Sequence, residues 1–164
     1  MPSGVESGTL RITMSNMIEQ RRDALVRRID QMREMDEWHL FQNFVLGLLP
    51  HDGYTGVRLS AVRNDFGRDA VAVTPKGGSC FVAVSFDCSL AKIRKDAKRW
   101  SEDPNREDAK VMVFITWDKV TEATLSKWRD AVKERHKLRL DVIHRETICA
   151  TATREGVWRE TCSR

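Results

Sequence analysis

The sequence has 164 residues, of which 41% are hydrophobic and 32% are charged, with a formal net charge of +4 and a pI near 9.0. This balance excludes a disordered chain and suits one domain with a proper hydrophobic core rather than two. The mild basicity permits a polyanionic partner without requiring one.

A leader and a helix are predicted at the start of the chain. Residues 1–14 bear Gly and Ser and show no hydrophobic period, so we expect a loose leader. A helix over residues 15–35 follows, with Asn16 as its capping residue. Its apolar stripe consists of Ile18, Leu25, Ile29 and Met32. This extra helix precedes the part of the chain that contains the strands.

A second helix begins at Asp36 or Glu37 and ends at Pro50. Its apolar face is formed by Trp38, Gln42, Val45 and Leu49. We therefore expect Gln42 to be at least partly buried, and a hydrogen-bonded core glutamine is its simplest interpretation.

Five runs have strand character, and they are GVRLSAV, RDAVAVT, SCFVAVSF, KVMVFITW and LRLDVI. A PKGG turn joins the second and third runs as a hairpin, and helices over 89–100 and 121–135 separate the later ones. The predicted fold is α/β, a mixed sheet of about five strands flanked by helices on both faces. We expect the domain to span 36–155, with a short helix at 145–153 and a tail at 156–164.

The four cysteines show no CxxC spacing, and Cys80 in an apolar run is expected to be a free buried thiol. No apolar run approaches the ~18 residues of a membrane span, and no signal-peptide core begins the chain. We therefore expect a cytoplasmic protein with no membrane partner.

Asp69 is the first residue that attracts attention. In the strand GRDAVAV it shares a face with Val71 and Val73, whereas Ala70 and Ala72 point the other way. A carboxylate at the head of an apolar strand face needs hydrogen bonds, a cation or a metal. Both a turn aspartate and a metal ligand remain open at this point.

The helix SLAKIRKDAKRW carries a cationic stripe at positions Lys92, Lys95 and Arg99, flanked by Arg94 and Lys98. Such a stripe suits contacts to phosphates, although a solvated amphipathic face explains it equally well. Lys92 falls in the first helical turn, where its ammonium can reach back along the strand end. The four histidines lack ligand spacing, and no nucleotide-binding glycine loop is present.

The order of these segments resembles the PD-(D/E)XK nuclease superfamily with its restriction-endonuclease-like fold. The resemblance covers residues 37–150 and rests on LFQNFVLGLL, GRDAVAV, FVAVSF and AKIRKD, followed by VMVFITW, WRDAVKER and LRLDVIHRE. It is closest to the nuclease-like modules at the N-termini of bacterial STAND-type defence ATPases. It implies the α/β fold expected above and a hydrolase that cuts phosphodiester bonds.

Carried over by position, the metal-binding aspartate of the superfamily falls on Asp69. The first acidic position falls on Gln42, and the (D/E/Q)xK element falls on Ala83 and Ser85, so a second ligand and the usual lysine are missing. Lys92 stands where some of these modules carry a lysine displaced onto the following helix.

The resemblance implies a Mg²⁺ or Mn²⁺ ion that is weakly held, because Asp69 is the one carboxylate retained. The Val84 carbonyl and a nucleic-acid phosphate would help to hold the ion, and Asp65 or Asp87 could stand in for the missing ligand. The candidate phosphate contacts are Arg94, Lys95, Lys98 and Arg99.

Three interpretations stay open. The first is a metal-dependent endonuclease that cuts DNA with Asp69 and Lys92, in the manner of an effector in antiviral defence. The second is a catalytically degenerate nuclease-fold domain that binds nucleic acid or docks a protein. The third is an α/β domain with a structural Asp69. The expected partner is nucleic acid, DNA in particular, and an ATPase or sensor domain or a second copy of the chain remain open partners.

Overall fold

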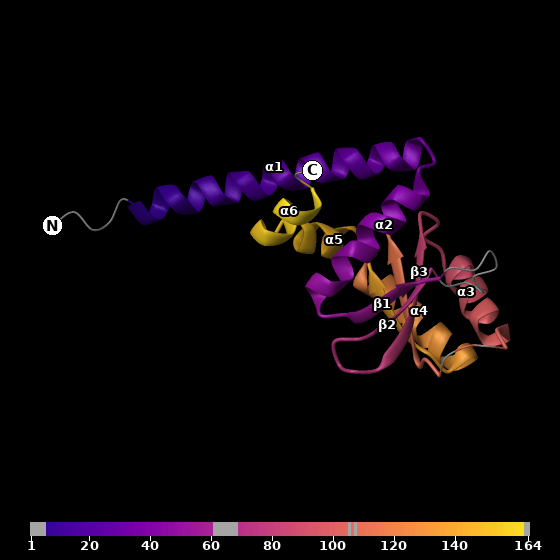
Figure 1. Ribbon diagram of the computed structural model, residues 1–164. Helices are drawn as coiled ribbons and strands as arrows, with labels where there is room; N and C mark the ends of the chain where they lie inside the picture. Colours follow the sequence, from indigo (N-terminus) through magenta and orange to yellow (C-terminus); the bar gives the residue numbers. More distant parts are fainter. Residues whose placement is uncertain (1–5, 61–68, 105, 107, 163–164) are drawn as a thin grey trace.

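Five strands form one mixed sheet in the spatial order β1-β2-β3-β4-β5. The computed structural model describes residues 6–60, 69–104, 106 and 108–162 (Figure 1). The strands are β1 (Thr55–Leu59), β2 (Ala70–Val73), β3 (Ser79–Ser85), β4 (Val111–Thr116) and β5 (Arg139–Ile143). The first three strands pair antiparallel, and β3, β4 and β5 pair parallel. The predicted mixed five-stranded sheet is confirmed.

Helices cover both faces of this sheet (Figure 1). Their bounds are α1 (Glu6–Glu34), α2 (Trp38–Leu48), α3 (Leu90–Glu102), α4 (Glu122–His136), α5 (Arg145–Ala152) and α6 (Glu155–Thr161), and a 3₁₀ turn η1 (Leu49–Asp52) follows α2. Side chains of α1, α2, α5 and α6 share one core with one face of the sheet. Side chains of α3 and α4 share the second core with the opposite face.

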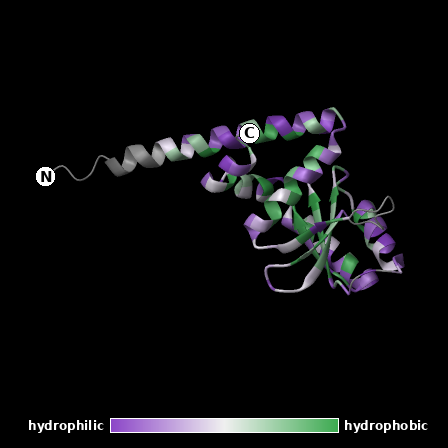
Figure 2. Cartoon of the chain, viewed as in Figure 1, coloured by the Kyte–Doolittle hydropathy of each residue, from purple (hydrophilic) through white to green (hydrophobic). Residues whose placement is uncertain are grey.

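Strand β3 shows why the two cores form. Cys80, Val82 and Val84 point into the first core, whereas Phe81 and Ala83 point into the second. This alternation follows from the period of two along a strand, and a strand covered on both faces must be apolar on both. The Phe81 ring stacks on Trp100 of α3 with the ring centroids 4.5 Å apart. Figure 2 shows the hydrophobic residues gathered on the central strands, while α3 is largely hydrophilic.

The first helix differs from its prediction at its start. Helix α1 begins at Glu6, so Asn16 lies inside it and most of the expected loose leader is helical. Gly8 is the one strong helix breaker in this stretch, and a single glycine costs a helix only about 1 kcal/mol. The N-terminal half extends beyond the rest of the molecule (Figure 1), and Ile18 of the predicted apolar stripe is 47% exposed. The other stripe residues are buried in the first core, namely Leu25, Ile29 and Met32.

Polar contacts fix the C-terminal half of α1 to the ends of the parallel strands. The Arg33 guanidinium binds the Asp118 carboxylate at 2.7 Å and donates to the Phe86 carbonyl at 2.9 Å. The Trp117 indole N–H donates to the Asp30 carboxylate at 2.7 Å. This half of α1 is therefore part of the domain, and it sets the position of the turn that leads into α2.

The predicted tail at 156–164 contains helix α6, which sequence analysis missed. Val157 is buried, and Trp158 packs against the first core. The Arg21 guanidinium lies over the Trp158 ring at 5.8 Å and binds the Glu155 carboxylate at 2.7 Å. Two apolar residues in so short a helix are too few to show a helical period, and the partner that stabilises them lies far away in sequence.

The four cysteines are free, and Cys80 is buried as expected from its apolar run. Burial raises the pKa of the Cys80 thiol to about 11, so this side chain stays a protonated apolar filler at neutral pH. Among the described residues, no helix combines the length and the apolar character that a bilayer crossing requires.

The end of helix α4 at Lys137 can be tested by substitution. Lys137 ends this helix in the left-handed region, at φ 57°. A side chain in this conformation costs about 1 kcal/mol relative to glycine. We expect Lys137→Gly to raise the free energy of unfolding by about 0.5–1 kcal/mol in a urea titration, less the small contribution of the exposed hydrogen bond from Lys137 Nζ to the Glu134 carbonyl. The matched control is Lys127→Gly at an exposed interior position of α4, which should lower it by about 1 kcal/mol. Equal destabilisation by both changes would contradict the assigned helix end.

Candidate active site

A cavity of about 310 Å³ lies where β3 ends and β2 begins. Its walls come from these two strands, from α3 and from the turn between α1 and α2. The lining residues are Asp36, Trp38, Asp69, Val84, Ser85, Phe86, Asp87, Lys92, Asp96 and Arg99. The structure therefore brings together the two residues on which the sequence analysis relied most, Asp69 and Lys92.

Asp69 is held at three points. Its backbone N–H donates to the Val82 carbonyl at 2.7 Å, and its own carbonyl accepts from the Ser60 N–H at 2.9 Å. Its carboxylate oxygen Oδ2 accepts the Val84 N–H at 2.6 Å. These bonds orient the carboxylate at the cavity wall, and they also give Asp69 a structural role. A carboxylate offers about four acceptor positions, so the bond to Val84 does not exclude a ligand.

Lys92 is anchored by a buried carboxylate. Ser89 caps α3 by accepting the Lys92 N–H at 3.1 Å, which sets the first turn of the helix. The Lys92 ammonium then binds Asp96 Oδ1, one turn further on, at 2.8 Å. The Asp96 side chain is only 2% exposed and that of Lys92 is 28% exposed. The buried Asp96 carboxylate therefore holds the Lys92 ammonium at the cavity wall.

The charges around the cavity are mixed, with four carboxylates and two cations. The acidic side chains belong to Asp36, Asp69, Asp87 and Asp96, and the basic ones to Lys92 and Arg99. An excess of carboxylates favours a cation in the cavity, and the cations favour a phosphate beside it. Within the part of the chain that the structure describes, however, no group of three acidic, histidine or cysteine side chains is arranged to hold a metal.

The remaining candidate ligands are divided. Asp87 and Ser85 line the cavity, and the Ser85 hydroxyl accepts the Asp87 N–H at 3.0 Å. Ala83 is buried in the second core and takes no part in the cavity. Gln42 is half-buried on α2, as expected, and does not line the cavity. Asp65 lies outside the described residues.

The cations of α3 do not share one surface. Arg99 lines the cavity, and Lys95 and Lys98 are exposed, with Lys98 3.7 Å from the Glu102 carboxylate. Arg94 is half-buried on the side of α4, close enough to lower the pKa of His136. Arg99 is therefore the α3 cation that accompanies Lys92 at the site.

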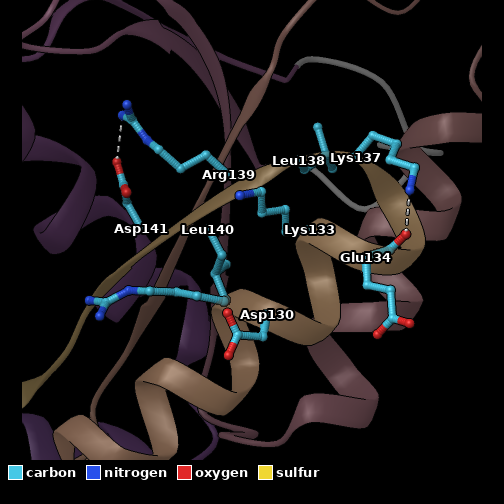
Figure 3. A pocket seen from close by; sticks show the side chains of 9 residues that line it. Asp130, Lys133, Glu134, Lys137, Leu138, Arg139, Leu140 and Asp141 are labelled. Carbon is cyan, nitrogen blue, oxygen red and sulfur yellow. Dashed lines mark hydrogen bonds and ion pairs between the residues drawn. The ribbon is translucent and has the colours of Figure 1, made fainter.

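A groove of about 960 Å³ lies elsewhere. It runs beside the edge strand β5 and the C-terminal half of α4 (Figure 3). Arg139 and Asp141 bind each other at 2.9 Å along the rim of this groove. It shares no lining residue with the cavity around Asp69, and its size reflects a shallow strip along a sheet edge rather than a set of converging chemical groups.

The amino-acid sequence matches the restriction endonuclease family (Mrr_cat) over residues 32–151, well over half of the chain. The chain belongs to the restriction endonuclease family. The matched segment contains all five strands and every residue that lines the cavity. A restriction endonuclease domain is a nuclease domain, so the predicted superfamily is confirmed and the substrate is nucleic acid. No curated protein and no solved structure matched the chain.

Sequence analysis missed two side chains of this restriction endonuclease domain. Asp96 lies four residues after Lys92, and this i, i+4 spacing of opposite charges on a helix was the available signal. Trp38 was predicted on the apolar face of α2, but it is 44% exposed and lines the cavity. Trp38 is the first residue of α2. At the end of a helix, a side chain can extend past the segments against which the rest of the helix packs.

Breaking the Lys92–Asp96 ion pair at the cavity wall should lower the stability of the protein. Lys92→Ala leaves the buried Asp96 carboxylate without its ammonium, and we expect the free energy of unfolding to fall by about 1–3 kcal/mol. Chemical denaturation of the purified variants measures this change. The control Lys95→Ala removes an exposed cation from the same helix and should stay within about 0.5 kcal/mol of the wild type. A loss that is equal in both variants would show that the Lys92–Asp96 bond contributes nothing to stability.

His136 predicts a pH effect on stability. Burial lowers its pKa, and the neighbouring Arg135 and Arg94 lower it further. A histidine in the unfolded chain titrates near 6.5, so the unfolded state binds more protons below this value and stability falls as the pH decreases. We expect His136→Gln to lose less stability than the wild type between about pH 7 and pH 5, as measured by urea denaturation. An unchanged slope in His136→Gln would contradict the prediction.

Proposed function

We propose that the chain is an endonuclease that hydrolyses DNA with Mg²⁺ or Mn²⁺, using Asp69 and Lys92. The observation that carries the proposal is the meeting of the Asp69 carboxylate and the Lys92 ammonium in one small cavity of a restriction endonuclease domain. Asp69 immediately precedes β2 and Lys92 lies on α3, more than twenty positions apart in sequence, and only the fold explains why both line one cavity.

The residues present suit a weakly held ion. Mg²⁺ is commonly bound through one or two carboxylates together with waters and substrate phosphates. Asp69 supplies one carboxylate already oriented by the Val84 N–H, and Asp87 or the Val84 carbonyl could supply a second oxygen on the same wall. When bound, the ion stabilises negative charge on the reacting phosphate and activates a water. We expect cleavage to need high metal concentrations.

Lys92 acts as an electrostatic and positioning group. An ammonium has three N–H donors, and the bond to Asp96 uses one of them. The others can donate to a phosphate oxygen or to the attacking water at the cavity. The Asp96 carboxylate on the same helix binds the ammonium at 2.8 Å. The carboxylate also limits the rotation of the lysine side chain, which on a helix would otherwise be less constrained than on a strand.

Further cations on α3 support contact with the DNA backbone. Arg99 lines the cavity, and Lys95 and Lys98 are exposed on the same helix. Each phosphate contact releases condensed counterions, so affinity should fall steeply as salt increases. A role as an effector in antiviral defence, attachment to an ATPase or sensor domain, the cytoplasmic location and dimerisation stay predictions.

One alternative has an observation in its favour. The two positions where the superfamily carries its second ligand and its lysine hold Ala83 and Ser85, and the Ala83 side chain is buried in the second core. The described residues also contain no three-ligand metal group. A domain that binds nucleic acid without cutting it, or that docks a protein, is consistent with both facts.

Cleavage of a supercoiled plasmid distinguishes these functions. We expect the wild type to nick DNA with Mg²⁺ or, more readily, Mn²⁺, and not with chelator. Asp69→Asn keeps an oxygen for the Val84 N–H but removes the charge, so it should fold normally and lose at least about 100-fold in rate. Lys92→Ala should lose about 10- to 1,000-fold after correction for its folded fraction.

The matched controls are Lys127→Ala and Asp130→Asn, which change an exposed cation and an exposed carboxylate on α4. Both should retain the wild-type rate at low salt. Cleavage that survives Asp69→Asn would refute the assigned metal ligand. Salt-sensitive binding by a wild type that never cuts would favour the binding domain, and a sharp fall in melting temperature on Asp69→Asn without any effect of metal would favour a structural aspartate.

A further inference from the structure

Trp38 is an exposed indole at the wall of the candidate active site. Its side chain is 44% exposed, yet it lines the same cavity as Asp69 and Lys92. Trp38 is not among the buried residues of either hydrophobic core. None of the hydrogen bonds, ion pairs or ring contacts found among the described residues involves its indole. The exposed part of this large aromatic surface is open to a ligand, and covering it would be favourable.

Contacts hold the backbone on both sides of Trp38 in place. Asp36, in the left-handed region at φ 55°, ends α1, and the Glu37 N–H reaches back to the Met32 carbonyl at 2.8 Å. One turn into α2, the Phe41 ring stacks on Phe86 with the centroids 4.6 Å apart. Phe86 also lines the cavity. The backbone of the first turn of α2 is therefore anchored at both ends, and it presents the Trp38 side chain at the cavity wall.

The groups on the cavity wall determine what this platform can bind. Lys92 and Arg99 provide cations suited to a phosphate, and Trp38 provides a flat apolar face. A phosphate next to a planar, uncharged ring system is the chemistry of a nucleotide. Because every base has a π face, stacking on an aromatic side chain recognises nucleotides without regard to sequence.

We propose that Trp38 stacks on the base of a nucleotide adjoining the phosphate bound at Asp69 and Lys92, and that the preferred substrate is DNA with an unpaired base at this position. The inference rests on the proposed function. A base inside a duplex is covered on both faces by its neighbours, so the indole can replace one of them only where the base is unpaired or extruded. A cavity of about 310 Å³, near the lower limit of ligand sites, suits one nucleotide rather than a duplex.

Binding of fluorescein-labelled oligonucleotides tests the proposal, with Ca²⁺ in place of Mg²⁺ and the anisotropy as readout. We expect Trp38→Ala to weaken binding of a single-stranded oligonucleotide by about 5- to 100-fold. Trp38→Phe keeps an aromatic face and should recover most of this loss. Binding of a blunt duplex should change less than about twofold, because its bases remain stacked.

A series of single-stranded oligonucleotides with one abasic site at successive positions sharpens this test. One position should weaken binding to the wild type about as much as Trp38→Ala does, and the same abasic site should cost Trp38→Ala nothing further. Met35→Ala removes another exposed apolar side chain beside the same turn and should behave as the wild type. Thermal denaturation checks that each variant is folded, which the exposure of both positions favours.

The outcomes separate this inference from the proposed function. A wild type that cuts or binds DNA, with Trp38→Ala unchanged on single strands, overturns the stacking platform and leaves the nuclease proposal standing. An equal loss on single strands and duplex overturns the preference for an unpaired base. A wild type that neither binds nor cuts any DNA overturns both proposals, and it leaves Trp38 as a contact for a protein.

Discussion

The burial of β3 on both faces is the constraint on which the rest of this molecule depends. Its five central residues are almost inaccessible to solvent, and α3 and α2 cover it from opposite sides. Polar side chains can therefore reach solvent only at the ends of the strand, where the covering helices leave it. The cavity occurs at such an end, where the chain turns from Ser85 towards the first turn of α3 and where β2 begins opposite. The location of the chemistry follows from the location of the core.

At this strand end, structural and chemical roles fall on the same atoms. The Asp69 carboxylate accepts the Val84 N–H where the β2–β3 pairing ends, and this bond satisfies a donor close to the buried strand. The same bond fixes the carboxylate in the orientation that a metal or a phosphate would meet. Asp96 likewise accepts a hydrogen bond from the Lys92 ammonium and keeps this group at the cavity wall. For this reason stability and cleavage must be measured together in any variant of these residues.

The sequence predicted those features that depend on neighbouring residues. The strands alternate or are apolar over short runs, the PKGG turn marks the hairpin, and Ser89 marks the start of α3, so the mixed sheet, the hairpin and this helix could be predicted. The features it did not predict depend on contacts between distant segments. Helix α6 is stabilised by Arg21 and the first core, and the exposure of Ile18 follows from the absence of a covering segment among the described residues. Periodicity identifies an apolar face and does not say whether another segment covers it.

The candidate site was harder to predict from the sequence than the fold. The match over residues 32–151 identifies the family but does not say which side chains take part in a reaction. The structure adds what a motif cannot express. A lysine on a helix has more rotational freedom than one on a strand, and the buried Asp96 restricts it through a carboxylate whose own desolvation is costly without a partner. A pair of this kind is a poor means of gaining stability compared with apolar packing, and its place at the wall of the cavity supports the proposed role of Lys92 as a fixed cation.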